Sequence, residues 1–399
     1  MPHAKSTIPL LTVAQALEAV LDGARPLGTE PVALDASLGR ILAETIASDA
    51  DMPPFDKSAM DGFAVAGTDD DGAYRVVAAL PAGAPPFRRL EQGECVRIMT
   101  GAPVPQGTGR VVRFEYASES GGRMRITRAE EGRNICPQGE DIRQGADLLA
   151  PGRPITVPAV GILAATGHTR VQVYRRPRVA IIATGAEIVE PHVAPPPGSI
   201  RNSNAWQLAA HVRQCGGSPR YLGIAADTTE AIAAKLVQSF VESDVIVLSG
   251  GVSMGDFDLV PGVLAAHGVE LCFQKLAVKP GHPTVFGRHN GHRVFGLPGN
   301  PVSTFVIFEL LVRPLLDRLA GRTDQPPTVQ GSLAGMVKGN PSQRTLFLPV
   351  AYDRAGRVTP VEYHGSAHLH AYCRANAVLR LDPGSPSLPE GTPVHVRPI

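Results

Sequence analysis

The sequence is poor in paired cysteines, aromatic residues and net charge, and each deficit excludes a class of protein. The five cysteines are scattered, and none forms a Cys-x-x-Cys pair, so neither a zinc site nor a disulfide framework is expected. Aromatic residues are only 5% of the chain, which argues against a base-stacking surface for single-stranded nucleic acid. The formal charge is +1, from 38 basic and 37 acidic residues, so nucleic-acid binding through bulk charge is not expected.

Long apolar runs are missing as well. No stretch approaches the roughly 20 residues that a membrane-spanning helix needs, so no membrane partner is expected. The first ten residues lack the charged-then-apolar pattern of a signal peptide. With the unpaired cysteines, this predicts a cytoplasmic protein. Apolar residues still make up 43% of the 399 residues, enough for the cores of two to four domains.

The pattern of residues changes several times along the chain. Residues 1–50 are predicted to be helical, with a capping box at Thr12 and Gln15. Residues 52–175 hold short β runs between Gly/Pro turns. From Arg178, apolar strands alternate with helices, which predicts a parallel sheet covered on both faces. A long helix opens at Asn300-Pro301, with a kink or an end at Pro314, and short strands return after residue 325. The predicted class is therefore α/β plus β, in several domains.

Three segments of the α/β region are suited to anions. Glycines in Leu248–Gly255 follow a strand and let backbone N–H groups approach a ligand, with Ser249 and Ser253 as hydroxyl donors. Lys275 and Lys279 are four apart, which on one strand would place both on one face. Gly296–Ser303 opens a helix whose N-terminus attracts negative charge. The alternatives are an ordinary turn, a solvated strand face and an Asn cap, and only the combination favours a binding site.

Carboxylates recur at the ends of the predicted strands. The candidates are Asp56, Asp61, Glu140, Asp141, Glu187, Asp227, Asp256 and Asp258, and such hard oxygen ligands suit Mg²⁺ bridging phosphates. Taken singly, several are explained as helix caps, since Asp227 with Glu230 forms a capping box and Asp258 precedes a helical segment. The residues alone predict a Mg²⁺-dependent transferase or hydrolase acting on a phosphorylated substrate.

The order of the motifs resembles the molybdopterin molybdenumtransferase family, which includes the E domain of gephyrin. The matching segments are PPFDKSAMDGFAV (53–65), RIMTGAPVPQG (97–107), GEDI (139–142), RPRVAIIATGAEIVEP (176–191), SIRNSN (199–204), LSGGVSMGDFD (248–258), KLAVKPGHPTVFG (275–287) and VFGLPGNPVS (294–303).

The resemblance implies an elongated homodimer whose active site lies at the subunit interface. Its four domains would be an elongated N-terminal domain (1–50 and 142–176), an inserted mostly β domain (51–141), a molybdopterin-binding three-layer α/β domain (177–325) and a C-terminal β domain (326–399). It implies adenylylated molybdopterin and molybdate as substrates, Mg²⁺ as cofactor and AMP as product. The molybdopterin adenylyltransferase is a candidate partner.

The resemblance also assigns roles to residues. Among the carboxylates, it implies that the functional ones are Asp61, Asp141, Glu187, Asp227 and Asp258. The catalytic set is Asp61, Thr100, Asp141, Glu187, Asp227, Asp258, Lys275 and Lys279, with Asp61, Glu187, Asp227 and Asp258 as the metal ligands. The substrate-binding set is Ser249, Gly250, Gly251, Ser253, Pro298, Gly299, Asn300, Pro301, Ser303, Arg344 and Ser366.

This chain departs from the usual family pattern at several positions close to the expected site. These are Lys57, Phe63, Gly109-Arg110, Cys136-Pro137, His282 and Gly365–Asn376. Three interpretations remain open: the active transferase, a carrier that binds molybdopterin without turnover, and another nucleotide-processing enzyme built on the α/β domain. The retained carboxylates and lysines favour the transferase over the carrier, and the two N-terminal motifs argue against the third. Molybdenum and tungsten are not distinguished, because their oxyanions share charge and size.

Overall fold

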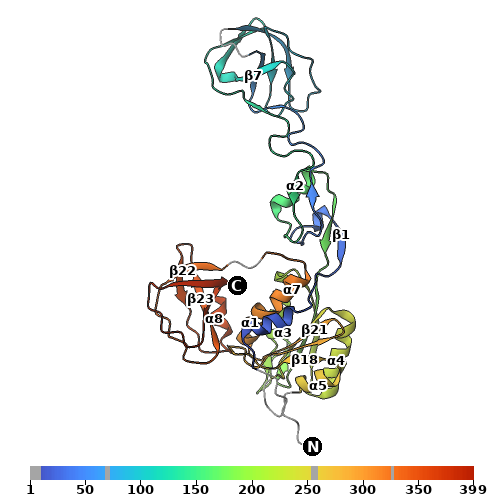
Figure 1. Cartoon of the computed structure of the whole chain (residues 1–399), viewed down its shortest axis with the longest axis vertical. Helices are drawn as coiled ribbons and strands as arrows, with labels where there is room; N and C mark the ends of the chain where they lie inside the picture. The colour runs from blue at the N-terminus through green and yellow to red at the C-terminus, as the bar shows by residue number, and fades with distance from the viewer. Residues whose placement is uncertain (1–9, 68–71, 253–258, 325–327) are drawn as a thin grey trace, which may run out of the picture.

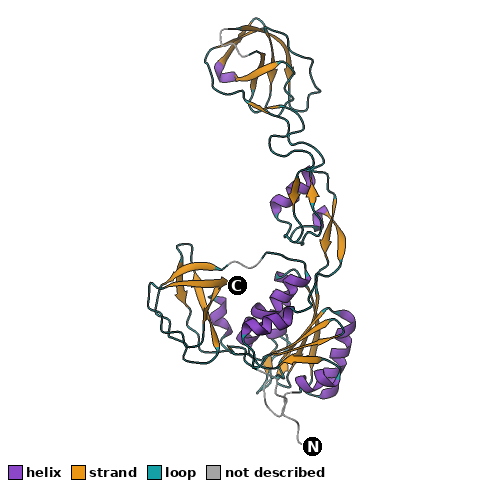
Figure 2. Ribbon diagram, in the orientation of Figure 1, coloured by secondary structure: helices purple, strands orange, loops and turns teal. Residues whose placement is uncertain are grey.

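The computed structural model describes residues 10–67, 72–252, 259–324 and 328–399. It forms an arm that stands on a base of two lobes (Figure 1). The arm has a β-rich distal module and a smaller middle module, and the base consists of an α/β body and a C-terminal β barrel (Figure 2). The predicted class, α/β plus β in several domains, is confirmed. Within the described ranges no helix is long and apolar enough to cross a membrane.

The distal module is a six-stranded sheet in the order β7-β4-β6-β5-β9-β8. Both faces of this sheet are covered by apolar side chains, so every residue of β4 is buried. A short strand pair, β3 with β10, lies beside it. The strands are β3 (Lys57–Ser58), β4 (Gly62–Ala66), β5 (Ala73–Leu80), β6 (Glu94–Ile98), β7 (Thr108–Arg113), β8 (Ala117–Ser120), β9 (Arg123–Ile126) and β10 (Ile135–Cys136), with a 3-10 turn η2 (Phe114–Tyr116).

The middle module is built from two short antiparallel strand pairs and one helix. It pairs β1 with β12 and β2 with β11, and packs α2 over a core that includes Leu42, Ile46 and Leu163. The β1–β12 ribbon continues downward and joins the module to the base (Figure 1). The elements are β1 (Thr29–Ala33), η1 (Leu34–Ala36), β2 (Ile46–Ala47), β11 (Asp147–Leu149), α2 (Val157–Ala165) and β12 (Arg170–Tyr174).

Helix was predicted over residues 1–50; among the described residues 10–50 the prediction is correct only for α1 (Val13–Leu21). The capping box of Thr12 and Gln15 is confirmed, with both reciprocal hydrogen bonds present. The helix ends because Gly23 adopts a φ of 65°, which favours glycine and directs the chain out of the helix. α1 packs into the core of the α/β body, whereas β1 and β2 belong to the middle module.

The α/β body has a six-stranded sheet in the order β16-β13-β17-β21-β20-β18, and the first four strands are parallel. Alternate residues of β13 point to opposite faces: Val179 and Ile181 join one buried cluster, and Ala180 and Ile182 join the other. Helices α1, α3, α6 and α7 cover the first face, and α4 and α5 cover the second. The predicted parallel sheet with helices on both faces is therefore confirmed.

The body contains short strands and helices in addition to the long parallel strands of its sheet. The strands are β13 (Arg178–Thr184), β14 (Ile188–Val189), β15 (Ile200–Arg201), β16 (Ser218–Ala225), β17 (Val245–Ser249), β18 (Glu270–Phe273), β20 (Val285–His289) and β21 (His292–Leu297). The helices are α3 (Asn204–Gln214), α4 (Thr229–Glu242), α5 (Val260–Ala266), α6 (Pro301–Ile307) and α7 (Arg313–Leu319).

A kink or an end of the helix was predicted at Pro314; the helical path does not end there but changes type just before it. A π-helical turn, η3 (Phe308–Val312), links α6 to α7, and Pro314 lies in the first turn of α7. Proline is tolerated in a first turn because its missing N–H has no partner to bond there. The helical path therefore accommodates Pro314 through the wider π-helical turn η3 that precedes it.

The C-terminal barrel closes through a fifth pairing. Its strands follow the order β23-β24-β22-β26-β25, and β25 pairs back to β23. Strand β19 of the preceding segment adds to β23 and so ties the barrel to the body. The elements are β19 (Val278–Lys279), β22 (Val329–Leu333), β23 (Thr345–Tyr352), β24 (Arg357–Pro360), α8 (Leu369–Cys373), β25 (Ala377–Leu381) and β26 (Pro393–Pro398).

A buried ionic cluster around Glu309 joins the barrel to the body. The Glu309 carboxylate accepts hydrogen bonds from Arg313 at 3.0 Å and Arg397 at 3.4 Å, and His211 lies 3.4 Å away. Burial opposes its ionisation, yet the His211 hydrogen bond and the two arginine charges hold the pKa of Glu309 below its ordinary value. Arg397 belongs to β26, so this carboxylate links the two lobes.

Replacement of Glu309 is expected to destabilise the base. Glu309→Gln removes the charge that balances Arg313 and Arg397, and a buried cation left without its partner costs about 3 kcal/mol. We expect a lower Tm in thermal unfolding. Glu230→Gln, an exposed carboxylate in the first turn of α4, is the control and should change stability by less than about 0.5 kcal/mol. Equal effects of the two changes would contradict a stabilising role for the cluster.

Candidate functional site

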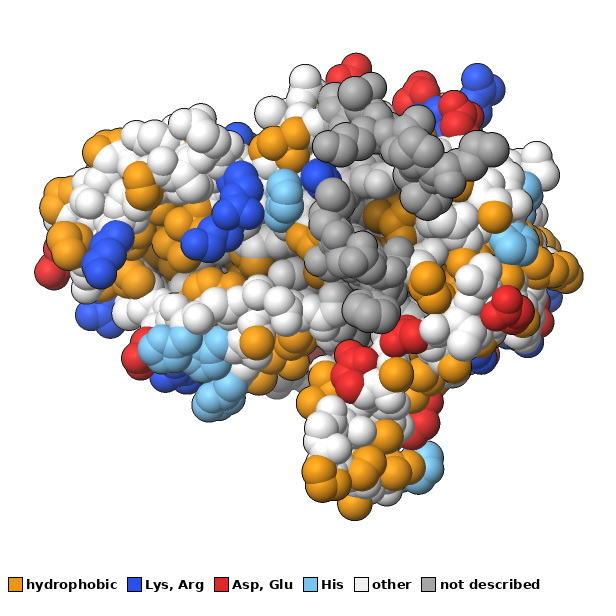
Figure 3. Space-filling model, turned by 90° about the horizontal axis from the view of Figure 1, so that it is seen from below, with side chains coloured by type: hydrophobic (Ala, Val, Ile, Leu, Met, Phe, Trp, Pro, Cys, Tyr) orange, Lys and Arg blue, Asp and Glu red, His pale blue; other side chains and the backbone are white. Residues whose placement is uncertain are grey.

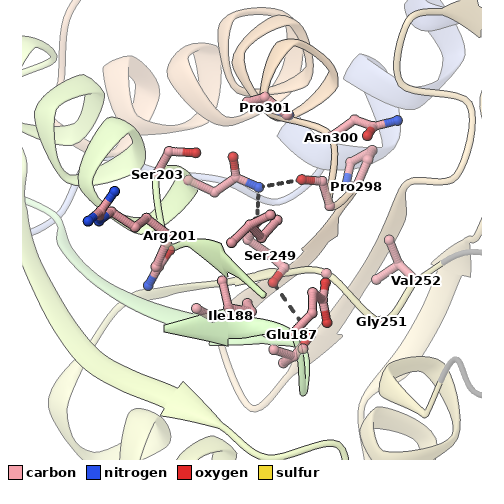
Figure 4. A pocket seen from close by; sticks show the side chains of 18 of the residues that line it. Glu187, Ile188, Arg201, Ser203, Ser249, Gly251, Val252, Pro298, Asn300 and Pro301 are labelled. Carbon is pink, nitrogen blue, oxygen red and sulfur yellow. Dashed lines mark hydrogen bonds between the residues drawn. The ribbon is translucent and has the colours of Figure 1, made fainter. Parts of the chain in front are cut away.

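The carboxyl ends of the parallel strands surround a pocket of about 700 Å³ in the α/β body (Figure 4). The loops after β13, β16, β17 and β21 all contribute to its wall, since parallel neighbours end at the same edge of the sheet. Of the predicted residues, the structure brings nine together here: Glu187, Asp227, Ser249, Gly250, Gly251, Pro298, Gly299, Asn300 and Pro301.

Two carboxylates lie in the wall. Glu187 follows β13 and Asp227 follows β16. The alternative role of Asp227 as a helix cap is wrong, because Thr228 is the N-cap of α4 and accepts the hydrogen bond from the Ala231 N–H at 3.2 Å. Asp227 instead accepts the Ala186 N–H at 2.7 Å and thereby ties two strand-end loops together.

The Ser-Gly-Gly loop is pressed against the end of β13. A Cβ on Gly250 would collide with the carbonyl oxygen of Thr184 and lie 2.8 Å from its Oγ1. Gly250 has a φ of 101° and Gly251 a φ of 63°, which side chains rarely adopt. The glycines therefore allow a close approach of backbones, as the sequence predicted, and they leave the backbone of this loop facing the pocket.

Asn204 connects three loops at the pocket. Its Nδ2 donates to Ser249 Oγ at 2.9 Å and to the Gly299 carbonyl oxygen at 2.8 Å (Figure 4). Asn204 is the first residue of α3, so one amide holds the start of that helix against the Ser-Gly-Gly and Pro-Gly-Asn loops. Its Oδ1 is buried and has no hydrogen-bond partner among the described residues.

The Pro-Gly-Asn loop leads into α6. Asn300 occupies the N-cap position, but its side chain makes no capping bond; Nδ2 donates instead to Ser366 Oγ at 2.8 Å. The Asn-cap alternative therefore does not account for this side chain. Ser366 also accepts the Val302 N–H at 3.1 Å through its carbonyl, so the barrel packs against the loop. Ser303 is buried within α6 and is not part of the pocket wall.

The lysine pair is arranged differently from the prediction. Lys275 and Lys279 do not share one strand, because β19 comprises only Val278 and Lys279. The segment breaks before β19 because Leu276 bridges to Leu11, whereas Val278 and Lys279 pair with β23 of the barrel. Lys275 is half-buried, Lys279 is exposed, and neither lines the pocket.

Asp61, Thr100 and Asp141 lie far from this pocket within the chain. All three belong to the arm side of the molecule, whereas the pocket is in the base (Figure 1). Thr100 donates to Asp61 Oδ1 twice, through its N–H and its hydroxyl, each at 2.7 Å. These two hydrogen bonds, the backbone one more than the side-chain one, lower the pKa of Asp61 below its ordinary value. Asp141 is exposed, and its N–H donates to the Met52 carbonyl.

The remaining predicted residues are placed as follows. Ser253 and Asp258 lie outside the described residues. Arg344 is half-buried at the start of β23 in the barrel, where its carbonyl accepts from Asn340 Nδ2 at 2.8 Å. It does not line the pocket.

Several lining residues were not among the predicted site residues. Figure 4 shows Arg201 and Ser203 among them, and the others include Asn202, Asn204, Pro283 and Ala367. The segment SIRNSN was present as a motif, but its polar residues carried no chemical signal of their own. Asn202 is buried and bonded to the Tyr221 hydroxyl at 2.7 Å, so it holds the wall in place.

Two of the family departures have structural roles near the pocket. His282 Nδ1 lies 2.6 Å from the Leu276 carbonyl oxygen and holds the loop that presents Pro283. Histidines gather on the barrel side of the base (Figure 3), where the rings of His364 and His368 stack with centroids 5.0 Å apart. Ala367, which lines the pocket, and Ser366, which accepts a hydrogen bond from the lining residue Asn300, lie between these two histidines in the sequence.

Comparison with known proteins agrees with this architecture. Residues 11–167 match the MoeA N-terminal region (domain I and II), residues 180–318 a probable molybdopterin binding domain, and residues 337–399 the MoeA C-terminal region (domain IV). The chain is 36% identical to the molybdopterin molybdenumtransferase of Bacillus subtilis over 384 residues, covering 92% of this chain and 89% of the relative. It is 34% identical to that of Staphylococcus epidermidis over 374 residues, covering 91% and 89%.

A solved structure, the molybdopterin biosynthesis moeA protein of Pyrococcus horikoshii, superimposes with a TM-score of 0.83 at 33% identity. The match covers 98% of this chain and 99% of that one. The chain belongs to the molybdopterin molybdenumtransferase family. The resemblance that the motifs indicated is thereby confirmed.

Gly250→Ala is expected to displace the Ser-Gly-Gly loop, because the new methyl group collides with Thr184. The matched control is Gly291→Ala, which has a similar φ of 88° but open space around it. Both variants should lose about 1 kcal/mol of folding stability, because alanine is strained at a positive φ. Only Gly250→Ala should also lose affinity for an anionic ligand such as AMP, measured by titration calorimetry. Equal loss in both variants would show that strain alone matters.

Proposed function

We propose that this protein inserts molybdenum into adenylylated molybdopterin, using molybdate and releasing AMP. The observation that carries the proposal is the pocket at the strand ends, where two carboxylates face two glycine-rich loops. The relatives named molybdopterin molybdenumtransferase support it, because they match this chain along nearly its whole length. The proposal includes a homodimer, a cytoplasmic location and delivery of substrate by the molybdopterin adenylyltransferase.

The pocket offers suitable groups for each part of the substrate. The backbone N–H of Gly251 and the Ser249 hydroxyl are suited to phosphate or pterin oxygens, whereas the Gly250 N–H already donates to the Leu297 carbonyl at 3.0 Å. A volume of about 700 Å³ is within the range of sites for large cofactor-sized ligands. Asn204 keeps the two loops at a fixed separation, so the ligand meets a preformed site.

The residues present fit a Mg²⁺ ion. Glu187 and Asp227 supply carboxylate oxygens to the pocket lining, and Asp227 Oδ1 has no hydrogen-bond partner among the described residues, because the Ala186 N–H bonds Oδ2. Among the described residues, no group of three metal-binding side chains gathers, so Asp258 and the substrate phosphates are the proposed further ligands. Bound Mg²⁺ would neutralise phosphate charge at the anhydride.

The chain's own residues orient and stabilise the reactants. Glu187 and Asp227 position the phosphate end, and Lys275 and Lys279 are proposed to offset oxyanion charge from the segment that leads to Pro283. No side chain of the pocket needs to act as a nucleophile, since catalysis would consist of positioning and electrostatic stabilisation.

The arm explains how Asp61 and Thr100 can serve the same reaction. Within one chain they lie at the far end of the molecule from the pocket (Figure 1). In a two-fold symmetric dimer, the arm of one subunit can lie over the base of its partner. We therefore place the complete active site between two subunits, with Asp61 of one facing Glu187 and Asp227 of the other.

AMP release tests the proposed reaction. Purified protein with adenylylated molybdopterin, Mg²⁺ and molybdate should release AMP, and Asp227→Asn should lower the rate by roughly 10²-fold or more, as loss of a stabilising group in the transition state does. Asp35→Asn, an exposed carboxylate of the middle module, is the control and should leave the rate unchanged. Tight binding of the substrate without AMP release, with molybdate or tungstate, would refute the enzyme and favour the carrier.

Mixing two inactive variants tests whether the site is shared. Asp61→Asn and Asp227→Asn are each expected to be inactive, but random exchange of their subunits restores one intact site in each mixed dimer. About a quarter of the wild-type activity should return, as the arithmetic of a two-fold dimer requires. If activity stays at the level of the separate variants after verified subunit exchange, Asp61 and Asp227 belong to the same chain's site or to different ones.

A further inference from the structure

A second pocket, of about 320 Å³, lies at the joint between the middle module and the α/β body. Its wall comes from three parts of the chain: residues 38–41 with 154, residues 174–176 at the end of β12, and the ends of α3 and α7. It shares no lining residue with the pocket at the strand ends. It is therefore a separate feature, which the proposed reaction does not use.

The wall of this joint pocket is strongly basic. It contains five arginines and no acidic residue: Arg40, Arg175, Arg176, Arg213 and Arg322. Arginine presents a planar set of donors that matches phosphate and other tetrahedral oxyanions. Such a concentration in one pocket is notable in a chain whose formal charge is only +1.

Three of these arginines are already neutralised by carboxylates outside the wall. Arg40 bonds Glu30, Arg175 makes two hydrogen bonds to Asp244 at 2.9 and 3.0 Å, and Arg322 contacts Asp317 and Asp324. These bonds hold the three guanidinium groups in place and explain their presence on structural grounds alone.

Arg176 and Arg213 are different, because both are exposed and neither has an ion-pair or hydrogen-bond partner for its side chain in the described chain. Arg213 lies in the last turn of α3, where the helix dipole favours a cation. That explanation does not extend to Arg176, which follows β12 in an extended segment. Two arginines without a side-chain partner therefore line one cavity, Arg176 from the segment between β12 and β13 and Arg213 from the last turn of α3.

The walls of this pocket are held by direct contacts between the middle module and the body. The Thr323 N–H donates to the Gly152 carbonyl at 3.0 Å, and the Leu27 N–H to the Leu319 carbonyl at 2.8 Å. A Cβ on Gly321 would collide with the Tyr174 ring, so the two parts approach as closely as their backbones allow. A ligand would enter a site that is already formed, which lowers the entropic cost of binding.

We propose that the joint pocket binds an oxyanion of the phosphate type, either free phosphate or the phosphate group of a nucleotide, between Arg176 and Arg213. The anion supplies the negative charge that these two arginines lack. Because Arg176 belongs to the arm side and Arg213 to the body, the bound anion bridges the joint and stiffens the arm. This inference does not rest on the proposed transferase reaction.

The test compares Arg176→Gln/Arg213→Gln with the wild type and with Arg354→Gln. Arg354 is also exposed and without a partner, but it lies in the turn between β23 and β24 of the barrel. Titration calorimetry at constant ionic strength uses inorganic phosphate in one arm and AMP in the other. The double variant should bind at least about tenfold more weakly, since two charge-assisted contacts are lost, and Arg354→Gln should bind as the wild type does.

Hydrogen exchange locates the ligand and keeps the two pockets apart. Phosphate or AMP should protect amides in residues 38–41 and 213–216 of the wild type and of Arg354→Gln, and this protection should vanish in the double variant. Protection by phosphate alone identifies the free anion as sufficient, and protection only by AMP identifies a nucleotide phosphate. Protection confined to residues 249–251 and 299–301, or equal protection in the double variant, would overturn the proposal without touching the transferase.

Discussion

The candidate site depends on the contact between the Ser-Gly-Gly backbone and the end of β13. Gly250 lies so close to Thr184 that no side chain fits, and the same approach lets Asn204 reach both Ser249 and Gly299. Without it the loops after β13, β17 and β21 would not enclose one pocket. A parallel sheet supplies the common edge, but the glycines decide how closely the loops converge.

The arm imposes the second constraint, because it separates carboxylates that the proposed reaction would use together. Asp61 accepts two hydrogen bonds from Thr100 in the arm, whereas Glu187 and Asp227 line the pocket in the base. Under the proposed function, a second subunit brings the two halves together. The basic joint between arm and base then acquires significance, because the angle of the arm decides where Asp61 is presented.

The barrel is fixed to the body through buried charge as well as through packing. Arg397 of β26 donates a hydrogen bond to the Glu309 carboxylate. Asn300, which lines the pocket, donates a hydrogen bond to Ser366 of the barrel segment. The π-helical turn that carries Glu309 lies between α6 and Pro314, so the widening that accommodates the proline also places the carboxylate. The continuous helical segment from α6 to α7 therefore both positions the pocket's rim and contributes to the stability of the base.

The sequence alone determined the elements whose causes are local. The capping box at Thr12, the apolar strand Arg178–Thr184, the proline at the start of α6 and the glycines after β17 all follow from short-range chemistry. Its motifs also identified the family and nine residues of the pocket wall. Only the tertiary structure decided the rest. Thr228, and not Asp227, is the N-cap of α4. Lys275 and Lys279 do not share one strand, because only Val278 and Lys279 pair with the barrel. Asn204 links the loops of the site through its hydrogen bonds. These outcomes depend on which distant segments meet, and residue type and spacing within one segment do not specify the particular side-chain contacts that it makes with another.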